Sequence, residues 1–124
     1  MDKSALKRAY KDNPPAAGIF QITNTQNGKI FIGKGMNVHG ILNSQQAQLQ
    51  FGSHKNPDLQ RDYNRYGMEK FDFKVLDQLE MSNKTAHEIQ EDLETLETLW
   101  LEKLQPYGER GYHKFPSAKP PANP

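Results

Sequence analysis

The sequence predicts an α/β (α+β) fold, in which helices flank a small three-stranded antiparallel sheet and the elements follow the order β-β-α-α-β-α. Two apolar segments, residues 18–20 and 31–33, are separated by ten residues that include Asn27-Gly28, a dipeptide typical of hairpin turns. Residues 71–75 alternate apolar and charged side chains, as expected of a half-buried strand. Helix signals precede and follow this third strand.

The hairpin pattern also predicts the direction of two phenylalanine side chains. If residues 27 and 28 alone form the turn, the two residue numbers of every cross-strand pair have an odd sum. Because successive side chains of a strand point to opposite faces, Phe20 and Phe31 then share one face of the sheet. We therefore expect these two rings to be near neighbours.

Three helices are expected around the sheet. Residues 38–51 have weak helical character around a glutamine-rich centre. The second helix has stronger end signals, because Asn56 can cap its first amides, Pro57 suits its first position and Gly67 can take the left-handed conformation that closes it. The last helix covers about residues 85–105, from a Thr-x-x-Glu capping box to a proline.

Composition limits the function classes. A chain of 124 residues with 35% hydrophobic residues suits one globular domain. The absence of cysteine excludes disulfides, thiolate metal sites and cysteine nucleophiles, and the four histidines lack the spacing of a zinc site. No apolar run approaches the roughly 20 residues needed to cross a membrane, and the basic N-terminus lacks the apolar centre of a secretory signal. We expect a cytoplasmic protein without a membrane partner.

The chain divides into three parts. We expect residues 1–16 to form a basic arm or short helix, residues 17–113 to form the folded domain, and residues 114–124, with four prolines, to be a disordered tail. Residues 29–74 carry seven Lys/Arg and four Asp/Glu, whereas residues 75–102 carry one Lys/Arg and eight Asp/Glu. This asymmetry excludes a uniformly basic protein that wraps DNA but leaves room for a local basic surface, and the acidic stretch can be the solvated side of a helix.

One acidic residue of the last helix has an unusual place. Glu97 falls within the apolar stripe of this helix, whereas the other acids fall outside it. A carboxylate on a core-facing stripe loses hydration unless it is paired or binds a metal. Two interpretations are open: an edge carboxylate that reaches solvent or a nearby lysine, and a metal-binding or catalytic group. The stripe consists of Ile89, Leu93, Leu96, Trp100 and Leu104.

Five blocks of sequence in a fixed order carry a resemblance to a known family. They are GIF-QITNTQNGKI-FIG, GSHKNPDLQRDYNRYG, FDFKVLDQL, LETLW and RGYH, and they extend from about Ala17 to His113. In order and spacing they are similar to the GIY-YIG endonuclease superfamily, in particular to the free-standing and homing endonucleases common in phages and mobile elements. The resemblance implies the α/β fold stated above.

The resemblance also implies where a nuclease would hold its reacting groups, and this chain departs from that pattern. The tyrosines of the first two motifs, which position the attacking water and the phosphate, correspond to Phe20 and Phe31. The family's arginine, which stabilises charge on the scissile phosphate, corresponds by an ungapped count to Ile41. Phenylalanine offers no hydrogen-bonding or titratable atom, and isoleucine cannot hold a phosphate. The resemblance therefore implies a degenerate active site.

Other positions keep polar groups. The glutamate that binds the family's single divalent cation corresponds to Glu97, which leaves two alternatives: a retained contact to magnesium or manganese, or a relic of that site. The asparagine of the closing motif corresponds to His113, whose ring can still form hydrogen bonds. Lys34 and His54 lie where the family has polar residues near its cleft, and we expect them to be the remaining phosphate contacts. Glu97 and His54 are the candidate catalytic residues.

Two functions from different classes follow. We expect a catalytically impaired nuclease-like protein that works as a binding or inhibitory module, encoded by a phage or mobile element and directed at a host or rival protein or at DNA. Such binding requires no cofactor. The alternative is an active DNA endonuclease that depends on magnesium or manganese, in which His54 or His113 acts as the base. In that rearranged site the arginine would be replaced by Lys34, Lys55 or Arg61.

Binding to DNA and binding to a protein would use different surfaces. A protein partner would contact an apolar cleft at the altered tyrosine and arginine positions, or the acidic face of the last helix, although the apolar side chains also fit a core. DNA phosphates would contact basic side chains that also fit an ordinary helix surface. The sequence does not predict an oligomeric state. The expected phosphate contacts are Lys34, Lys55, Arg61 and Arg65.

Overall fold

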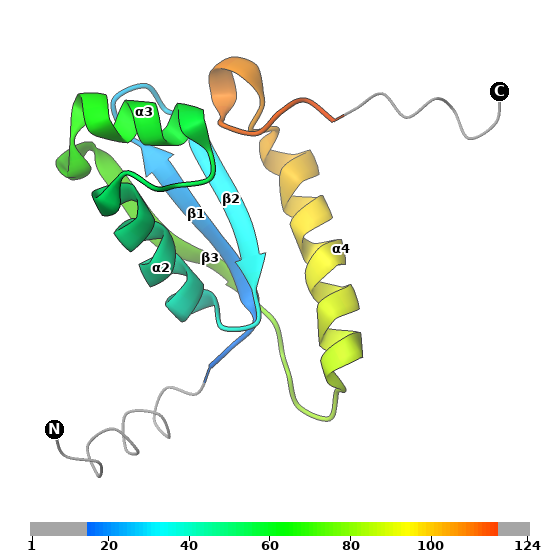
Figure 1. Cartoon of the computed structure of the whole chain (residues 1–124). Helices are drawn as coiled ribbons and strands as arrows, with labels where there is room; N and C mark the ends of the chain where they lie inside the picture. Colours follow the sequence, from blue (N-terminus) through cyan, green and yellow to red (C-terminus); the bar gives the residue numbers. More distant parts are fainter. Residues whose placement is uncertain (1–14, 117–124) are drawn as a thin grey trace, which may run out of the picture.

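A computed structural model of the protein describes residues 15–116, and its elements follow the predicted order β-β-α-α-β-α. The expected basic arm (residues 1–16) and proline-rich tail (residues 114–124) lie almost wholly outside the described residues. The elements are β1 (Gly18–Asn24), β2 (Ile30–Gly35), α2 (Val38–Phe51), α3 (Pro57–Tyr66), β3 (Phe71–Gln78) and α4 (Ala86–Leu104), with short 3₁₀ helices at Met68–Lys70 and Gly108–Arg110 (Figure 1).

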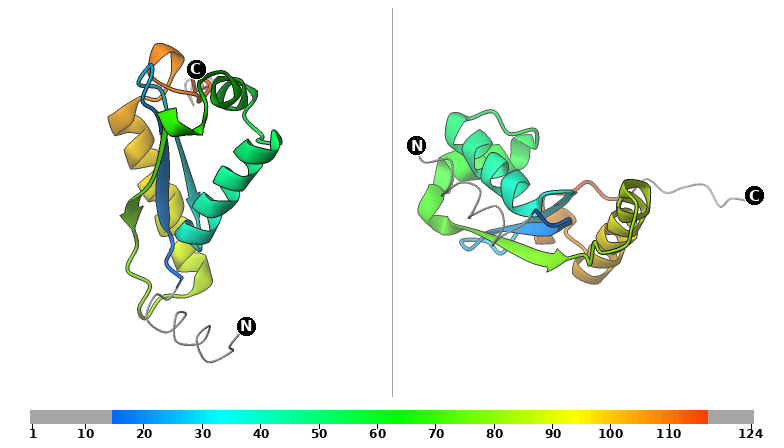
Figure 2. Two further views of the ribbon diagram at one scale, coloured as in Figure 1. Left: turned by 90° about the vertical axis from the view of Figure 1, so that its left-hand side faces the viewer. Right: turned by 90° about the horizontal axis from the view of Figure 1, so that it is seen from below.

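The three strands form one antiparallel sheet in the order β2-β1-β3, so that β1 is central and β2 is an edge strand. Helices α2 and α3 cover one face of this sheet, and α4 lies against the other (Figure 2). The predicted fold class is therefore confirmed. Within residues 15–116, no helix combines the length and the apolar character needed to span a bilayer.

The turn between β1 and β2 differs from the predicted two-residue turn. Ile22 pairs with Phe31 rather than with Gly33, and the chain reverses over residues 25–28. The amide of Gly28, which has a φ of +81°, donates to the carbonyl of Asn24 at 2.7 Å. Because the pairing is displaced by an even number of residues, the faces are unchanged. The predicted neighbours Phe20 and Phe31 have ring centroids 6.2 Å apart.

Two apolar cores follow from the alternation of side chains along the strands. One lies between the sheet and helices α2 and α3, and the other lies between the sheet and α4. The first is built from Phe20, Ile22, Val38, Leu42, Leu49, Leu59, Tyr63, Phe71 and Tyr112. The second is built from Ala17, Ile19, Ile32, Ile89 and Leu93.

The starts of α3 and α4 confirm the signals read from the sequence, whereas Gly67 closes α3 with a φ of 88° and a ψ of 158° rather than in the expected left-handed helical conformation. The side chain of Asn56 accepts the amide of Leu59 at 3.0 Å, and Pro57 is the first residue of α3. At the start of α4, Thr85 and Glu88 form both hydrogen bonds of a capping box. These caps fix the starting points of the two helices because they satisfy amides that the helices cannot satisfy themselves.

A buried hydroxyl connects the C-terminal segment to the rest of the domain. The Tyr112 hydroxyl donates to Oδ2 of Asp62 at 2.8 Å and accepts from Nδ2 of Asn24 at 3.0 Å. Burial raises the pKa of this phenol, which therefore keeps its proton. The Tyr112 amide also donates to the carbonyl of Ile30 at 2.9 Å. Together these bonds hold residues 111–113 along the free edge of β2.

Replacing Tyr112 with phenylalanine tests this connection. Because Tyr112→Phe leaves Asn24 and Asp62 without their shared partner, we expect a loss of about 1 to 3 kcal/mol in the free energy of unfolding. Urea denaturation monitored by circular dichroism measures this change. Tyr63→Phe is the matched control, since Tyr63 is also buried in the same core but its hydroxyl bonds to no other described residue. Equal stability losses in the two variants would contradict the assigned role of Tyr112.

Candidate functional site

The candidate site surrounds the edge strand β2, whose alternating side chains reach both faces of the sheet. Phe31 packs against the core under α2 and α3, whereas Ile32 belongs to the core under α4. Lys34 shares the face of Ile32 and reaches α4. His113 lies at the edge between the two faces, where its Nε2 accepts the amide hydrogen of Ile32 at 3.0 Å.

Phe31 is the centre of a cluster of rings on the α2 and α3 side. Its ring stacks on His113 with centroids 4.8 Å apart and planes inclined by 6°. His54 meets the same ring edge-on at 5.4 Å. Phe20 completes the cluster, and its ring lies directly on Gly33, where a Cβ atom would collide with it. The two phenylalanines therefore occupy the motif positions as packing residues.

His54 is held by hydrogen bonds on both ring nitrogens. Its Nδ1 accepts the amide hydrogen of Asn56 at 3.0 Å, so Nε2 carries the proton and donates to Oε1 of Gln45. Burial lowers the pKa of His54, and the positive charge of Lys55 lowers it further. The ring is therefore neutral at pH 7, and its only lone pair is already in use.

His113 is held in a similar way. Because Nε2 accepts the Ile32 amide hydrogen, the neutral ring carries its proton on Nδ1. Burial lowers the pKa of His113, and the nearby carboxylate of Glu97 partly opposes this effect. The imidazole thus completes the hydrogen bonding of an edge strand.

Glu97 is paired with a lysine. Lys34 Nζ lies 2.8 Å from Glu97 Oε1, and the two side chains are 32% and 23% exposed. Glu97 comes from the core-facing stripe of α4, and Lys34 comes from the end of β2, so the ion pair joins the helix to the sheet. A lysine partner is one of the two surroundings expected for this carboxylate.

These residues do not fit the divalent cation that the resemblance implies. An ammonium group occupies Oε1 of Glu97, and a second positive charge at that oxygen would be repelled. Nowhere in residues 15–116 do three His, Cys, Asp or Glu side chains converge in a manner that could hold a metal. A magnesium site can use a single carboxylate with water, so the obstacle is the lysine rather than the number of ligands.

Ile41 stands at the position of the family's arginine, and the groups around it are apolar like its own side chain. Ile41, on α2, packs against the first core and lies over Gly35. Lys55, which could replace the arginine, lies close enough to His54 for its positive charge to lower the pKa of that ring, but its own side chain is exposed.

The four expected phosphate contacts are not brought together. Lys34 faces α4, whereas the two arginines lie on α3, which covers the opposite face of the sheet. Arg61 is 3.3 Å from Asp58, and the Arg65 guanidinium lies 5.3 Å from the centre of the Tyr66 ring. Lys34 therefore lies on a different face of the sheet from Arg61 and Arg65.

Sequence reasoning missed the polar side chains that hold the site. Gln60 is buried, accepts the amide hydrogen of His54 at 3.0 Å and donates to the carbonyl of Leu49 at 3.0 Å. Asp62, which accepts the Tyr112 hydroxyl, is buried on the same helix. Their position beside the apolar side of α3 was the available signal, because residues three and four apart share a helix face.

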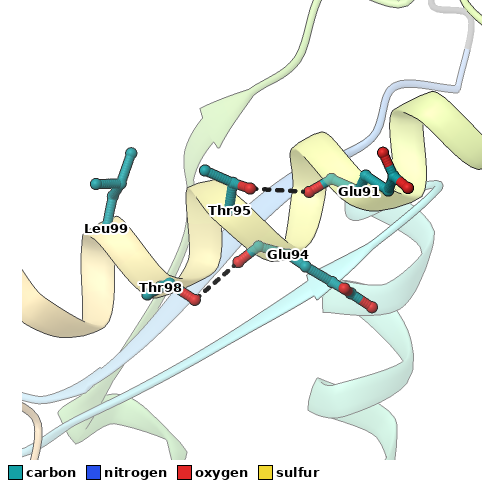
Figure 3. A pocket seen from close by; sticks show the side chains of 5 residues that line it. All are labelled: Glu91, Glu94, Thr95, Thr98 and Leu99. Carbon is teal, nitrogen blue, oxygen red and sulfur yellow. Dashed lines mark hydrogen bonds between the residues drawn. The ribbon is translucent and has the colours of Figure 1, made fainter.

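A separate hollow of about 470 Å³ lies on α4 (Figure 3). Its two threonine hydroxyls donate to carbonyls of the preceding helical turn, at 3.1 and 3.0 Å. It includes neither Glu97 nor any residue of the ring cluster, so it is distinct from the candidate site. The hollow is lined by Glu91, Glu94, Thr95, Thr98 and Leu99.

Comparison with known proteins identifies the fold. No sequence profile of a protein family matches the chain, and no curated protein is significantly similar to it. A solved point-mutant form of the catalytic domain of the intron endonuclease I-TevI is similar, with 23% identity and a TM-score of 0.63 over 79% of this chain and 92% of that one. A second structure, the catalytic domain of the homing endonuclease I-TevI, has 27% identity and a TM-score of 0.57 over 77% and 95%.

I-TevI is a GIY-YIG homing endonuclease. The match covers nearly the whole length of the I-TevI catalytic domain and about four-fifths of this chain. The likeness agrees with the order of the five sequence blocks and with the observed arrangement of strands and helices. The protein therefore has a GIY-YIG-like fold.

Proposed function

We propose that this GIY-YIG-like domain does not cleave phosphodiester bonds and instead works as a binding or inhibitory module. The observation that carries the proposal is the ion pair between Lys34 and Glu97, which engages the carboxylate that a metal-dependent nuclease would need. The expected source, a phage or mobile element, rests on the sequence resemblance.

The ring cluster supports the same proposal. Phosphodiester hydrolysis requires a group that positions or deprotonates water and a group that stabilises charge on the phosphate. Phe20 and Phe31 supply neither, and Ile41 is a partly buried apolar side chain that packs against the core. Losing one charge-stabilising contact typically reduces a rate by about 10² to 10³. Losses within one site do not simply add, but each of them removes a different part of the chemistry.

The alternative, an active endonuclease with a rearranged site, is favoured by the presence of Glu97 itself. In that alternative His54 or His113 would accept a proton from water. Both rings are neutral, but the lone pair of each is already engaged by a backbone amide hydrogen, from Asn56 and Ile32 respectively. A working base would require one of these bonds to break. The geometry therefore supports the binding function better.

The described surface favours a protein partner over DNA. Three of the four expected phosphate contacts already face partners within the domain. Leu99, by contrast, is 55% exposed within the acidic hollow of α4. An apolar side chain beside acidic groups suits a protein whose surface is basic and partly apolar. We therefore propose that the target is a protein, and binding to DNA is the competing result that the experiment below can detect.

A cleavage assay tests the absence of nuclease activity. We expect supercoiled plasmid to stay intact when the purified protein is present in excess with Mg²⁺ or Mn²⁺, because no water-activating group is available. Agarose gels measure nicking, and Glu97→Ala, run beside the wild type, reports any contaminating nuclease. Nicking by the wild type that Glu97→Ala abolishes would establish the alternative. A gel-shift titration on the same DNA with added salt separates phosphate binding from no DNA binding.

The two held histidines make the stability of the domain depend on pH. Their pKa values are lowered in the folded state, so their contribution to stability is present above the unfolded value of about 6.5 and is lost as pH falls through the lowered folded values. We expect urea midpoints to fall between pH 7.5 and pH 5. The double variant His54→Gln/His113→Gln should flatten this dependence, whereas the exposed-surface control His87→Gln should not. An unchanged pH dependence in the double variant would contradict the assignment.

A further inference from the structure

We propose that the ammonium group of Lys34 is the cation that pairs with the Glu97 carboxylate, and that this charge keeps divalent ions away from the carboxylate. This inference deepens the proposed function and rests on it. It assigns to Lys34 a role different from the phosphate contact expected from the sequence. It also predicts that a single substitution converts the site into one that binds a divalent cation.

The fold directs Lys34 to Glu97. Along β2, Ile32 and Lys34 point to the α4 side, and Ile32 is buried in the core there. Lys34 is close to the end of the strand, where its long side chain can follow the sheet surface and bring Nζ to 2.8 Å from Glu97 Oε1. Both side chains are less than one-third exposed, so solvent screens this pair less than a fully exposed one.

Among the groups around Glu97, Lys34 supplies the positive charge that balances the carboxylate. Among the described residues, Lys34 is the one basic side chain within ion-pair distance of Glu97. His113 is close enough for the Glu97 charge to act on it, but burial lowers its pKa and its Nε2 is occupied by the Ile32 amide hydrogen. A neutral imidazole contributes no full charge to the balance. The Glu97 carboxylate therefore depends on Lys34 for the positive charge that balances it.

A divalent ion at Glu97 must displace the ammonium group or approach it closely. Either change is unfavourable, because the lysine loses its partner or because two positive charges come together. Removing the ammonium while keeping the aliphatic stem, as in Lys34→Met, leaves a partly buried carboxylate without a cation. Such a carboxylate attracts a hard divalent ion, which needs one or two carboxylates and keeps its remaining water ligands.

Manganese titrations monitored by NMR test the proposal at the site itself. We expect Mn²⁺ to broaden the amide signals of Gly33 and His113 in ¹⁵N-labelled Lys34→Met at about tenfold lower concentration than in the wild type, because the repelling charge is gone. The double variant Lys34→Met/Glu97→Gln should lose this gain. Lys84→Met is the matched control, since Lys84 forms a comparable pair with Asp92 at 2.7 Å and should leave both signals unchanged.

Two results would overturn the proposal. One is broadening of Gly33 and His113 in the wild type at the Mn²⁺ concentration that affects Lys34→Met. The other is a folded Lys34→Met protein whose signals respond no more strongly than those of the wild type. If Lys34→Met loses its dispersed spectrum, Lys34→Gln replaces it, and the wild-type titration is informative alone. A wild type that binds Mn²⁺ at Glu97 without cutting DNA refutes this inference only, whereas Glu97-dependent cleavage refutes the proposed function.

Discussion

The register of the β1–β2 hairpin decides which side chains meet at the edge of β2. With Ile22 paired to Phe31, the side chains of β2 alternate so that Phe31 turns toward α2 and α3 while Lys34 turns toward α4. A displacement by one residue would exchange these faces, bury the lysine under α2 and separate it from Glu97. Both halves of the candidate site therefore depend on one strand pairing.

The free edge of β2 is completed by the C-terminal segment. The backbone of Tyr112 and the ring of His113 accept or donate hydrogen bonds along this edge, and the buried Tyr112 hydroxyl holds the segment in place. An exposed strand edge invites pairing with other chains, so this cover also protects the domain. Burial keeps His113 neutral, and the Ile32 amide engages its Nε2, which makes the imidazole a structural group.

Most of the fold could be predicted from local signals, because caps and alternation act over a few residues. The Asn56 cap and the Thr85 capping box fix helices α3 and α4, and the even displacement of the hairpin left the faces as predicted although the turn itself was wrong. The site was harder to predict, since its contacts join distant parts of the chain. Lys34 and Glu97 are 63 residues apart, and nothing in either segment alone indicates that they meet.

The negative charge of Glu97 is balanced by a lysine rather than by a divalent ion. Diffraction from crystals soaked in Mn²⁺, with data collected for anomalous scattering by manganese, tests this claim most directly. We expect no anomalous peak at Glu97 and a distance near 2.8 Å between Lys34 Nζ and Glu97 Oε1. A manganese peak within bonding distance of the Glu97 carboxylate, with Lys34 turned away, would contradict it.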